Sequence, residues 1–204
     1  MAYLTMPAPG PCSPPYNTVG YKVVQPSNDT TLQPGVYCGG IKVGTVNVNF
    51  APGMYWLVGG GMDIGSAGHL TGTGVTFVNM NGPAADGGAN KFSIINMQNN
   101  GTVVNLSAMT SGPLAGILFY QDPSAGKPGQ TYVNMIKSGV GTTFNGSFYF
   151  PTQDLTVESG GSITVNGGIV ARQILVQNNN THLTVTGGGG GIGFFRLKRA
   201  SIIE

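Results

Sequence analysis

Paired carboxylates are the side chains of this chain that could break a glycosidic bond, because that hydrolysis needs two acids at a set separation. Asp154 and Glu158 stand four residues apart in the phrase DLTVE, and on a strand they would lie on one side roughly 13 Å apart. That separation exceeds the ~6.5–9.5 Å of inverting glycosidases. Asp122 could meet Asp154 across a fold, or it could instead cap a turn in the phrase YQDPSAG. The carboxylates therefore leave a carbohydrate-active enzyme as an alternative hypothesis only.

The basic side chains do not complete another reaction centre. β-Helical lyases use Ca²⁺ and an Arg base, but no acidic ladder surrounds Arg172 in the sequence. His69 and His182 lie more than a hundred residues apart, and neither stands in a triad-like phrase. The glycine run at 187–191 lacks the Lys-Ser/Thr of a phosphate loop. We therefore expect no catalytic residue, no cofactor and no metal.

Two cysteines, Cys12 and Cys38, are expected to form one disulfide. An even cysteine count in a Gly-rich, loop-rich chain is compatible with an oxidising compartment. Neither cysteine has a His or a further Cys nearby that could complete a metal site. The bridge would close a loop of about 25 residues and contribute roughly 3 kcal/mol by chain entropy. Two reduced thiols are the alternative.

Aromatic residues are a second group that could act, by contact rather than by chemistry. Adjacent aromatics on a strand face opposite ways, so one of each pair can point outward, where Tyr and Trp suit contact with sugar or protein. The candidates for surface contact are Tyr55, Trp56, Tyr120 and Tyr149. The alternative is that these side chains fill the core and cover its corners.

Threonine recurs in two short runs, at 71–76 and at 181–186. A flat threonine array on a solenoid face is the device of ice-binding proteins. The motif is not repeated in every expected coil, so ordinary β-propensity is the better explanation.

The elements that carry these residues are short strands separated by Gly, Pro, Asn and Asp. The phrase PGVY at 34–37 returns as PGMY at 52–55, and related phrases recur about every 18 to 22 positions. A fixed period in that range is typical of a solenoid, whose coils stack so that inward side chains form one apolar column. Gly and Asn turn the corners. The sequence predicts an all-β, right-handed parallel β-helix of about seven to eight coils.

The composition sets the boundaries and excludes some partners. Residues 1–31 are predicted to be a Pro- and Asn-rich extended leader, 32–190 the β-solenoid, and 191–204 a capping or linking segment. Glycine makes up 35 of 204 residues and charged residues only 8 %. A net charge of +2 is too small for a nucleic-acid-binding face. No apolar stretch approaches the ~20 residues of a membrane span.

Several phrases resemble one protein family. LQPGVYCGGIKV, LTGTGVTFVNM, SGPLAGILFYQD and FNGSFYFPTQDLTV are similar to the C-terminal region of TadG-like proteins of the bacterial tight-adherence (Tad) pilus machinery. The resemblance covers residues 12 to about 200. It implies a β-helical fold and export. Family members commonly carry an N-terminal membrane anchor, so the chain is expected to correspond to their exported part.

These observations together predict a non-enzymatic, exported structural or adhesive module associated with a surface filament or pilus, with end-to-end self-assembly into fibres as one form. The expected location is the periplasm, the cell surface or the extracellular space. The expected partners are further copies of the chain or other envelope proteins, with a surface polysaccharide as another candidate. A polysaccharide-binding module or a carbohydrate-active enzyme is the alternative.

Overall fold

The chain folds as a stack of parallel strands, shown by a computed structural model of all 204 residues. The structure describes residue 9 and residues 23–65, 68–82, 91–97, 103–137, 142–158, 161–178 and 180–187. These ranges contain sixteen strands in one continuous sheet, and every strand pairing in them is parallel. The predicted all-β parallel β-helix is therefore confirmed. The described residues contain no helix long and apolar enough to cross a bilayer.

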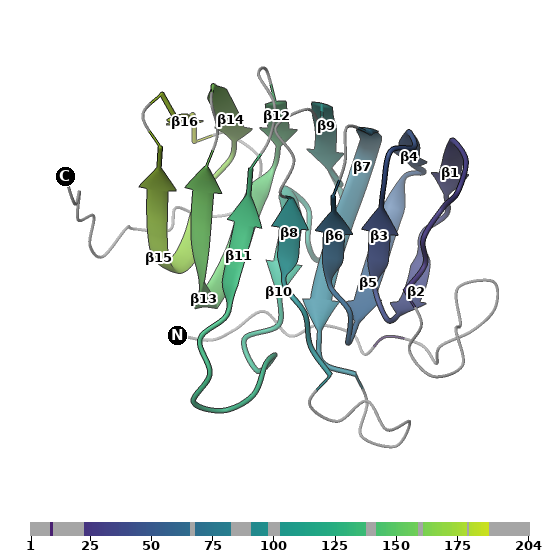
Figure 1. Cartoon of the computed structure of the whole chain (residues 1–204), viewed down its shortest axis with the longest axis horizontal. Helices are drawn as coiled ribbons and strands as arrows, with labels where there is room; N and C mark the ends of the chain where they lie inside the picture. Colours follow the sequence, from purple (N-terminus) through teal and green to yellow (C-terminus); the bar gives the residue numbers. More distant parts are fainter. Residues whose placement is uncertain are drawn as a thin grey trace.

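The strands form three faces, which we name by the residues that they present. The Thr/Asn face consists of β1 (Thr30–Leu32), β4 (Val48–Phe50), the first part of β7 (His69–Met80), β9 (Val103–Ala108), β12 (Thr142–Asn145), β14 (Ser162–Asn166) and β16 (His182–Val185). In Figure 1 these strands lie side by side along the upper edge of the molecule.

The second face is the aromatic face. It consists of β2 (Gly35–Cys38), β5 (Gly53–Val58), the second part of β7, β10 (Ile117–Gln121), and the first parts of β13 (Ser147–Glu158) and β15 (Ile169–Gln177). The third, the ion-pair face, consists of β3 (Ile41–Val43), β6 (Met62–Ile64), β8 (Ile95–Met97), β11 (Val133–Ile136) and the second parts of β13 and β15. Its strands stand at the front of Figure 1.

The coils differ in length although their strands stay in register. The strand pairings place Thr71, Asn105 and Thr143 on three successive rungs of the Thr/Asn face, and the two coils between them are much longer than the others. Each of those two coils contains more residues than the even spacing of repeated phrases from which the number of coils is predicted. The described residues accordingly place seven strands on the Thr/Asn face and six on each other face. They form six complete coils and one strand of a seventh, fewer than the seven to eight coils predicted.

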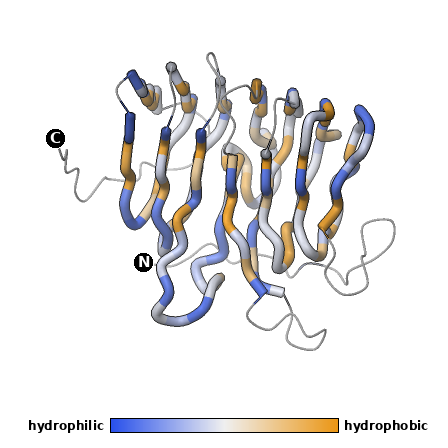
Figure 2. The backbone as a smooth tube through the Cα atoms, viewed as in Figure 1, coloured by the Kyte–Doolittle hydropathy of each residue, from blue (hydrophilic) through white to orange (hydrophobic). Residues whose placement is uncertain are grey.

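The interior is a column of stacked aromatic rings. Tyr55, Phe77, Phe119 and Phe148 occupy equivalent inward positions in four successive coils, and each is at most 1 % exposed. Their ring centroids are 5.2 to 5.4 Å apart from coil to coil, which is the spacing of favourable aromatic pairs. Figure 2 shows the alternation that produces this column, as short hydrophobic and hydrophilic bands along the tube.

Glycine pairs make the corners because two backbones meet there. A Cβ atom on Gly60 would lie 1.9 Å from the carbonyl oxygen of Gly39, and one on Gly40 would lie 2.3 Å from that of Gly61. Gly40 and Gly61 also have φ values of +76° and +64°, a region that L-residues with a side chain rarely adopt. This close approach explains why a Gly pair or run follows each Pro-Gly-x-Tyr phrase.

Strand pairing begins slightly before the expected start of the solenoid at residue 32. Val24 forms a parallel bridge with Ile41, and β1 starts at Thr30. Most of the expected leader, residues 1–31, and all of the expected segment 191–204 lie outside the described residues.

Candidate functional face

The Thr/Asn face carries a continuous rank of small polar side chains. Alternation along each short strand turns one residue inward and the next outward. Each of the seven strands has an outward Thr or Asn at the same rung position, and His69, Val103, Ser162 and His182 are further outward residues of this face. The strand registers place the Thr and Asn residues in one line: Thr31, Asn49, Thr71, Asn105, Thr143, Thr164 and Thr184. A second line runs beside it: Thr73, Ser107, Asn145, Asn166 and Thr186.

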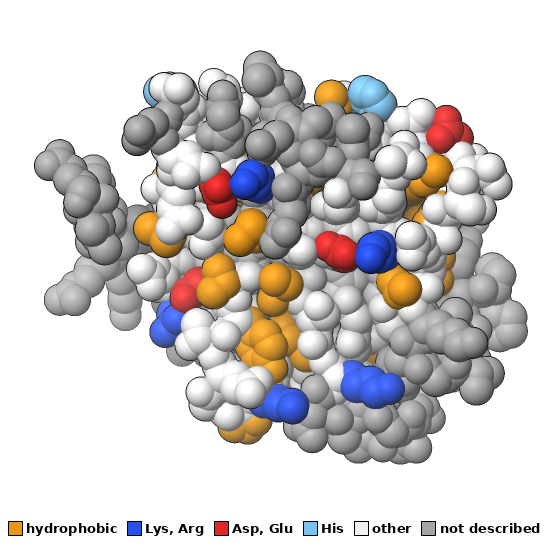
Figure 3. Space-filling model, in the orientation of Figure 1, with side chains coloured by type: hydrophobic (Ala, Val, Ile, Leu, Met, Phe, Trp, Pro, Cys, Tyr) orange, Lys and Arg blue, Asp and Glu red, His pale blue; other side chains and the backbone are white. Residues whose placement is uncertain are grey.

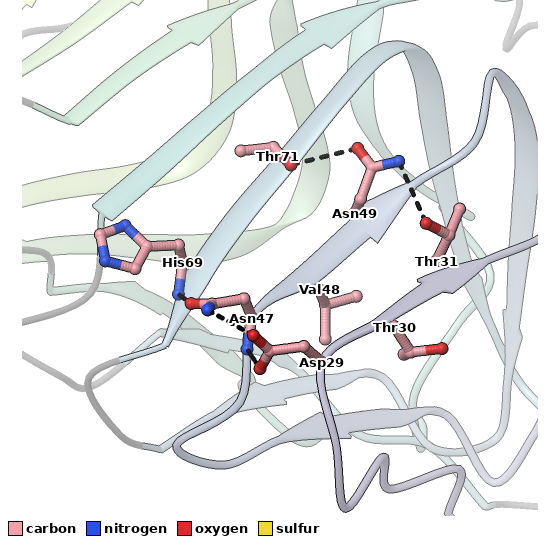
Figure 4. A pocket seen from close by; sticks show the side chains of 8 residues that line it. All are labelled: Asp29, Thr30, Thr31, Asn47, Val48, Asn49, His69 and Thr71. Carbon is pink, nitrogen blue, oxygen red and sulfur yellow. Dashed lines mark hydrogen bonds between the residues drawn. The ribbon is translucent and has the colours of Figure 1, made fainter.

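A shallow open depression lies at the N-terminal end of this face, and Figure 4 shows the eight residues that line it. Asn49 connects two rungs there, because its Nδ2 donates to Thr31 Oγ1 at 3.5 Å and its Oδ1 accepts from Thr71 Oγ1 at 3.1 Å. The side-chain amide and hydroxyl groups therefore form hydrogen bonds with one another from strand to strand along the stack.

An acidic residue, Asp29, lies at the margin of the same depression. Asp29 accepts hydrogen bonds from the backbone N–H and the side-chain amide of Asn47, both at 2.8 Å. These two bonds, the backbone one first, lower the pKa of the Asp29 carboxyl below its usual value. Asn47 Oδ1 in turn accepts the backbone N–H of His69 at 3.1 Å, so three successive rungs are tied together.

The ladder of hydrogen bonds recurs at the other end of the face. Asn166 Nδ2 donates to Asn145 Oδ1 at 2.6 Å, and Thr186 Oγ1 donates to Asn166 Oδ1 at 2.9 Å. Bonds between rungs restrict the rotamers of these side chains before any ligand arrives. A preorganised surface loses less conformational entropy on binding than a mobile one.

The chemistry of the two lines is uniform. They contain neutral hydroxyl and amide groups, repeating about every 4.8 Å from strand to strand and about 6.6 Å along a strand. They contain no charged and no aromatic residue, and the nearest described carboxylate, Asp29, lies at the margin. These two lines can bind a neutral, polar, regularly repeating surface by many weak contacts. The exposed imidazoles of His69 on β7 and His182 on β16 lie on the same face, outside the two lines.

The carboxylates that the sequence offers as catalytic candidates form hydrogen bonds or ion pairs with nearby side chains. Asp122 caps a turn, because its Oδ1 accepts from both the backbone N–H and the hydroxyl of Ser124. Asp154 on β13 pairs with Arg172 on β15, with two contacts of 2.6 and 2.8 Å. The sequence-based alternative of a turn-capping Asp122 is therefore confirmed.

Glu158 likewise pairs with side chains of adjacent coils. Its Oε1 accepts from Lys137 Nζ at 3.1 Å and from Asn178 Nδ2 at 2.7 Å, and these bonds, that of Lys137 first, lower the pKa of the Glu158 carboxyl. Figure 3 shows acidic and basic side chains next to one another on the ion-pair face. The described residues contain no group of three metal-ligating side chains.

The prediction that Tyr55 makes a surface contact is wrong. Its ring points into the core and is 0 % exposed, and its hydroxyl lies 2.8 Å from the carbonyl oxygen of Leu32 and 2.7 Å from that of Ala51, so the two acceptors share its one proton. Tyr55 and Trp56 alternate on β5, so only one can face inward, and the register against Phe77 assigns that position to Tyr55.

Trp56, Tyr120 and Tyr149 do lie on the outer side of the aromatic face, but they are not freely exposed. Trp56 is half-buried, Tyr120 is 2 % exposed and Tyr149 is 9 % exposed. They belong to a second apolar cluster with Leu114 and Ile117, outside the coil. The two tyrosine rings stack at 5.2 Å, and burial, followed by the nearby Asp122 charge, raises the pKa of Tyr120 to about 12.

Of the two cysteines of the expected disulfide, only Cys38 is among the described residues. Cys38 is 1 % exposed on the outer side of β2, and no cysteine is free among the described residues. Cys12 lies outside those residues, so the pairing of Cys12 with Cys38 stays a prediction.

Sequence reasoning missed the Thr/Asn face as a unit. The threonine runs at 71–76 and 181–186 are visible in the sequence, but Asn105, Thr143 and Thr164 stand at unequal intervals and show no common period. A search that allows coils of variable length would align the recurring short phrases with outward Thr or Asn. Comparison with known proteins adds no assignment, since no family model, curated protein or solved structure matches the chain.

Proposed function

We propose that the chain is a non-enzymatic, exported structural or adhesive module, associated with a surface filament, that uses its Thr/Asn face to hold a neutral polysaccharide. The observation that carries the proposal is the unbroken rank of outward Thr and Asn side chains across all seven strands of that face. A polysaccharide presents neutral hydroxyl groups at a regular repeat. Many parallel contacts to such a polymer suit adhesion rather than turnover.

The architecture supports a structural role in the same molecule. The aromatic column and the strand ladders form one continuous body in the described residues, which makes the face stiff over six rung spacings of about 4.8 Å. The phrases that resemble TadG-like proteins support an exported, filament-associated setting. The carboxylates support binding over hydrolysis, because Asp122, Asp154 and Glu158 each have a local partner.

Co-sedimentation with insoluble neutral polysaccharides tests the proposal. The wild-type chain is expected to sediment with at least one neutral glucan or chitin-type polymer. Asn105→Tyr, in the middle of the face on an exposed side chain, is expected to weaken binding because the bulky ring lifts the polymer off several rungs. Gln173→Tyr, equally exposed but on the ion-pair face, is the matched control and should bind like wild type.

Two results would remove the proposal. Equal binding by wild type and both variants would show that the face is not the contact surface. Steady release of soluble sugar from a polysaccharide, abolished by Asp154→Asn, would show instead that the chain is an enzyme.

A further inference from the structure

Two coils carry an insertion at the corner between the aromatic face and the ion-pair face. Residues 81–94 separate β7 from β8, and residues 122–132 separate β10 from β11, whereas only residues 39–40 and 59–61 occupy the same corner of two earlier coils. We call the two longer segments the corner insertions. In Figure 1 the one between β10 and β11 extends below the stack.

The inward side chain at this corner changes from apolar to polar in the same two coils. Strand register places Leu57 on β5, Asn79 on β7 and Gln121 on β10 in one row. Leu57 and Gln121 are 0 % exposed and Asn79 is 1 % exposed. Each amide is the last inward residue of its strand before a corner insertion. The row therefore becomes polar where the chain leaves the coil.

The amides of Asn79 and Gln121 are buried without enough protein partners. Four buried side-chain atoms of the described residues lack a hydrogen-bond partner, and three of them are Asn79 Oδ1, Gln121 Oε1 and Gln121 Nε2. The fourth is Asn96 Oδ1 on β8. Asn79 Nδ2 donates to the carbonyl oxygen of Ser93 at 2.9 Å, so exchanging its amide atoms would only set two oxygens against each other.

Other buried amides near this corner do have protein partners. Asn134 is 0 % exposed and Gln153 is 2 % exposed. Asn134 Nδ2 donates to Gln153 Oε1 at 3.1 Å, and Asn134 Oδ1 accepts the backbone N–H of Ile95 at 2.9 Å. Nearly all buried polar groups of folded proteins bond to protein or to ordered water. The unpaired atoms of Asn79 and Gln121 therefore point to a bound molecule.

We propose that Asn79 and Gln121 form an internal water site at the base of the corner insertions. The three unpaired atoms are two acceptors and one donor, and water offers hydrogen bonds of both kinds. One water that donates to Asn79 Oδ1 and Gln121 Oε1 links two successive coils, while a second accepts from Gln121 Nε2. Buried waters commonly make about three such bonds.

A metal cation fits these atoms less well than water does. The two amide oxygens could coordinate a cation, but the N–H donor of Gln121 beside them would repel it. The described residues contain no buried charged side chain that would balance the ion, and an unpaired buried charge is far more unfavourable than an unpaired amide.

The water site lies where both corner insertions are attached to the coil. The side chain of Asn79 binds Ser93 at the end of the first insertion. Its carbonyl oxygen accepts the backbone N–H of Asp122, at the start of the second, at 2.9 Å. The bound water therefore helps to fix the two insertions to the stack. The inference does not depend on what the Thr/Asn face binds.

A high-resolution crystal structure of the full chain tests the site directly. We expect ordered water within hydrogen-bond distance of Asn79 Oδ1 and of both amide atoms of Gln121. Magnetic relaxation dispersion of water oxygen-17 provides a second test, because it counts long-lived internal waters in solution. Gln121→Leu should remove at least one of them. Gln173→Leu, at an exposed amide on β15, is the matched control and should leave the count unchanged.

Stability in denaturant titrations distinguishes a hydrated amide from an unpaired one. If the Gln121 amide is hydrated, Gln121→Leu removes a partner of the waters and should raise the unfolding equilibrium constant several-fold. If it is unpaired, the same change should lower that constant by about tenfold, because a buried group without a partner is destabilising. Gln173→Leu should change it little.

Three outcomes would overturn the inference. The first is a crystal structure with no ordered water at the two amides, and the second is one with a cation or a protein atom in that place. The third is a Gln121→Leu variant that is more stable than wild type. The crystal structure of the wild-type chain decides alone if Gln121→Leu does not fold.

Discussion

Truncation of one ring in the middle of the aromatic column should destabilise the fold strongly. Phe119 is 0 % exposed and its ring centroid lies 5.4 Å from that of Phe77, 6.1 Å from Phe144 and 5.2 Å from Phe148. Phe119→Ala removes these contacts and leaves a cavity, which costs about 3–5 kcal/mol at a buried site. For a domain of this size that corresponds to a fall of roughly 6–20 °C in Tm.

Thermal melts followed by circular dichroism measure this loss, and a second phenylalanine provides the control. Phe92 is half-buried and makes a ring contact with Tyr132 at 4.8 Å, away from the column. Phe92→Ala should cost about 1 kcal/mol, in the range of a single aromatic pair, and lower Tm by only about 2–4 °C. Equal shifts for the two variants would refute the reasoning, because they would mean that Phe119 does not sit in a dry, continuous column.

The remaining predictions concern a corner, a buried hydroxyl and the cysteines. Gly60→Ala should destabilise by about 1–3 kcal/mol through overpacking, since its Cβ would meet the backbone of the adjacent coil, whereas Gly44→Ala, with nothing within 4 Å, should be neutral or slightly stabilising in denaturant titrations. In an ultraviolet pH titration the Tyr120 hydroxyl, whose pKa is raised from 10.0 to about 12, should ionise only near pH 12. Because burial favours its neutral form, the stability it contributes is present below pH ~10 and is lost as pH rises through ~12. A tyrosinate signal unchanged by Tyr120→Phe at high pH would contradict that assignment. A thiol reagent in denaturant should find no reactive cysteine until reductant is added, and two reactive thiols before reduction would show that Cys12 and Cys38 are not bridged.

The sequence is informative about the fold because its corners and its alternation are local. The phrases at 34–37 and 52–55 indicate a corner followed by a strand, and the structure has β2 and β5 there. The offset between the two phrases is not the strand register, however, because it would place Gly35 opposite Gly53, whereas Gly35 lies opposite Tyr55. The difference arises at the corner, where Pro34 occupies the space that a Cβ on Gly53 would need, at 2.6 Å.

The functional face is harder to predict, because it is defined by register rather than by local sequence. The two longest coils separate Thr71, Asn105 and Thr143, so no fixed period aligns them. The sequence alone also does not show which of two adjacent aromatic side chains points inward. Alternation makes Tyr55 and Trp56 point opposite ways, but only the pairing of Tyr55 with Phe77 shows which of them enters the core.

A distance along the stack tests the solenoid most directly. Thr31 and Thr184 are the first and last members of the Thr/Asn rank, six rungs apart. Spin labels on cysteines introduced at these two positions should show a narrow distance distribution near 29 Å by pulsed electron resonance, since six spacings of about 4.8 Å separate the strands. A broad distribution, or a narrow one far from that value, would contradict the parallel coil on which the Thr/Asn face depends.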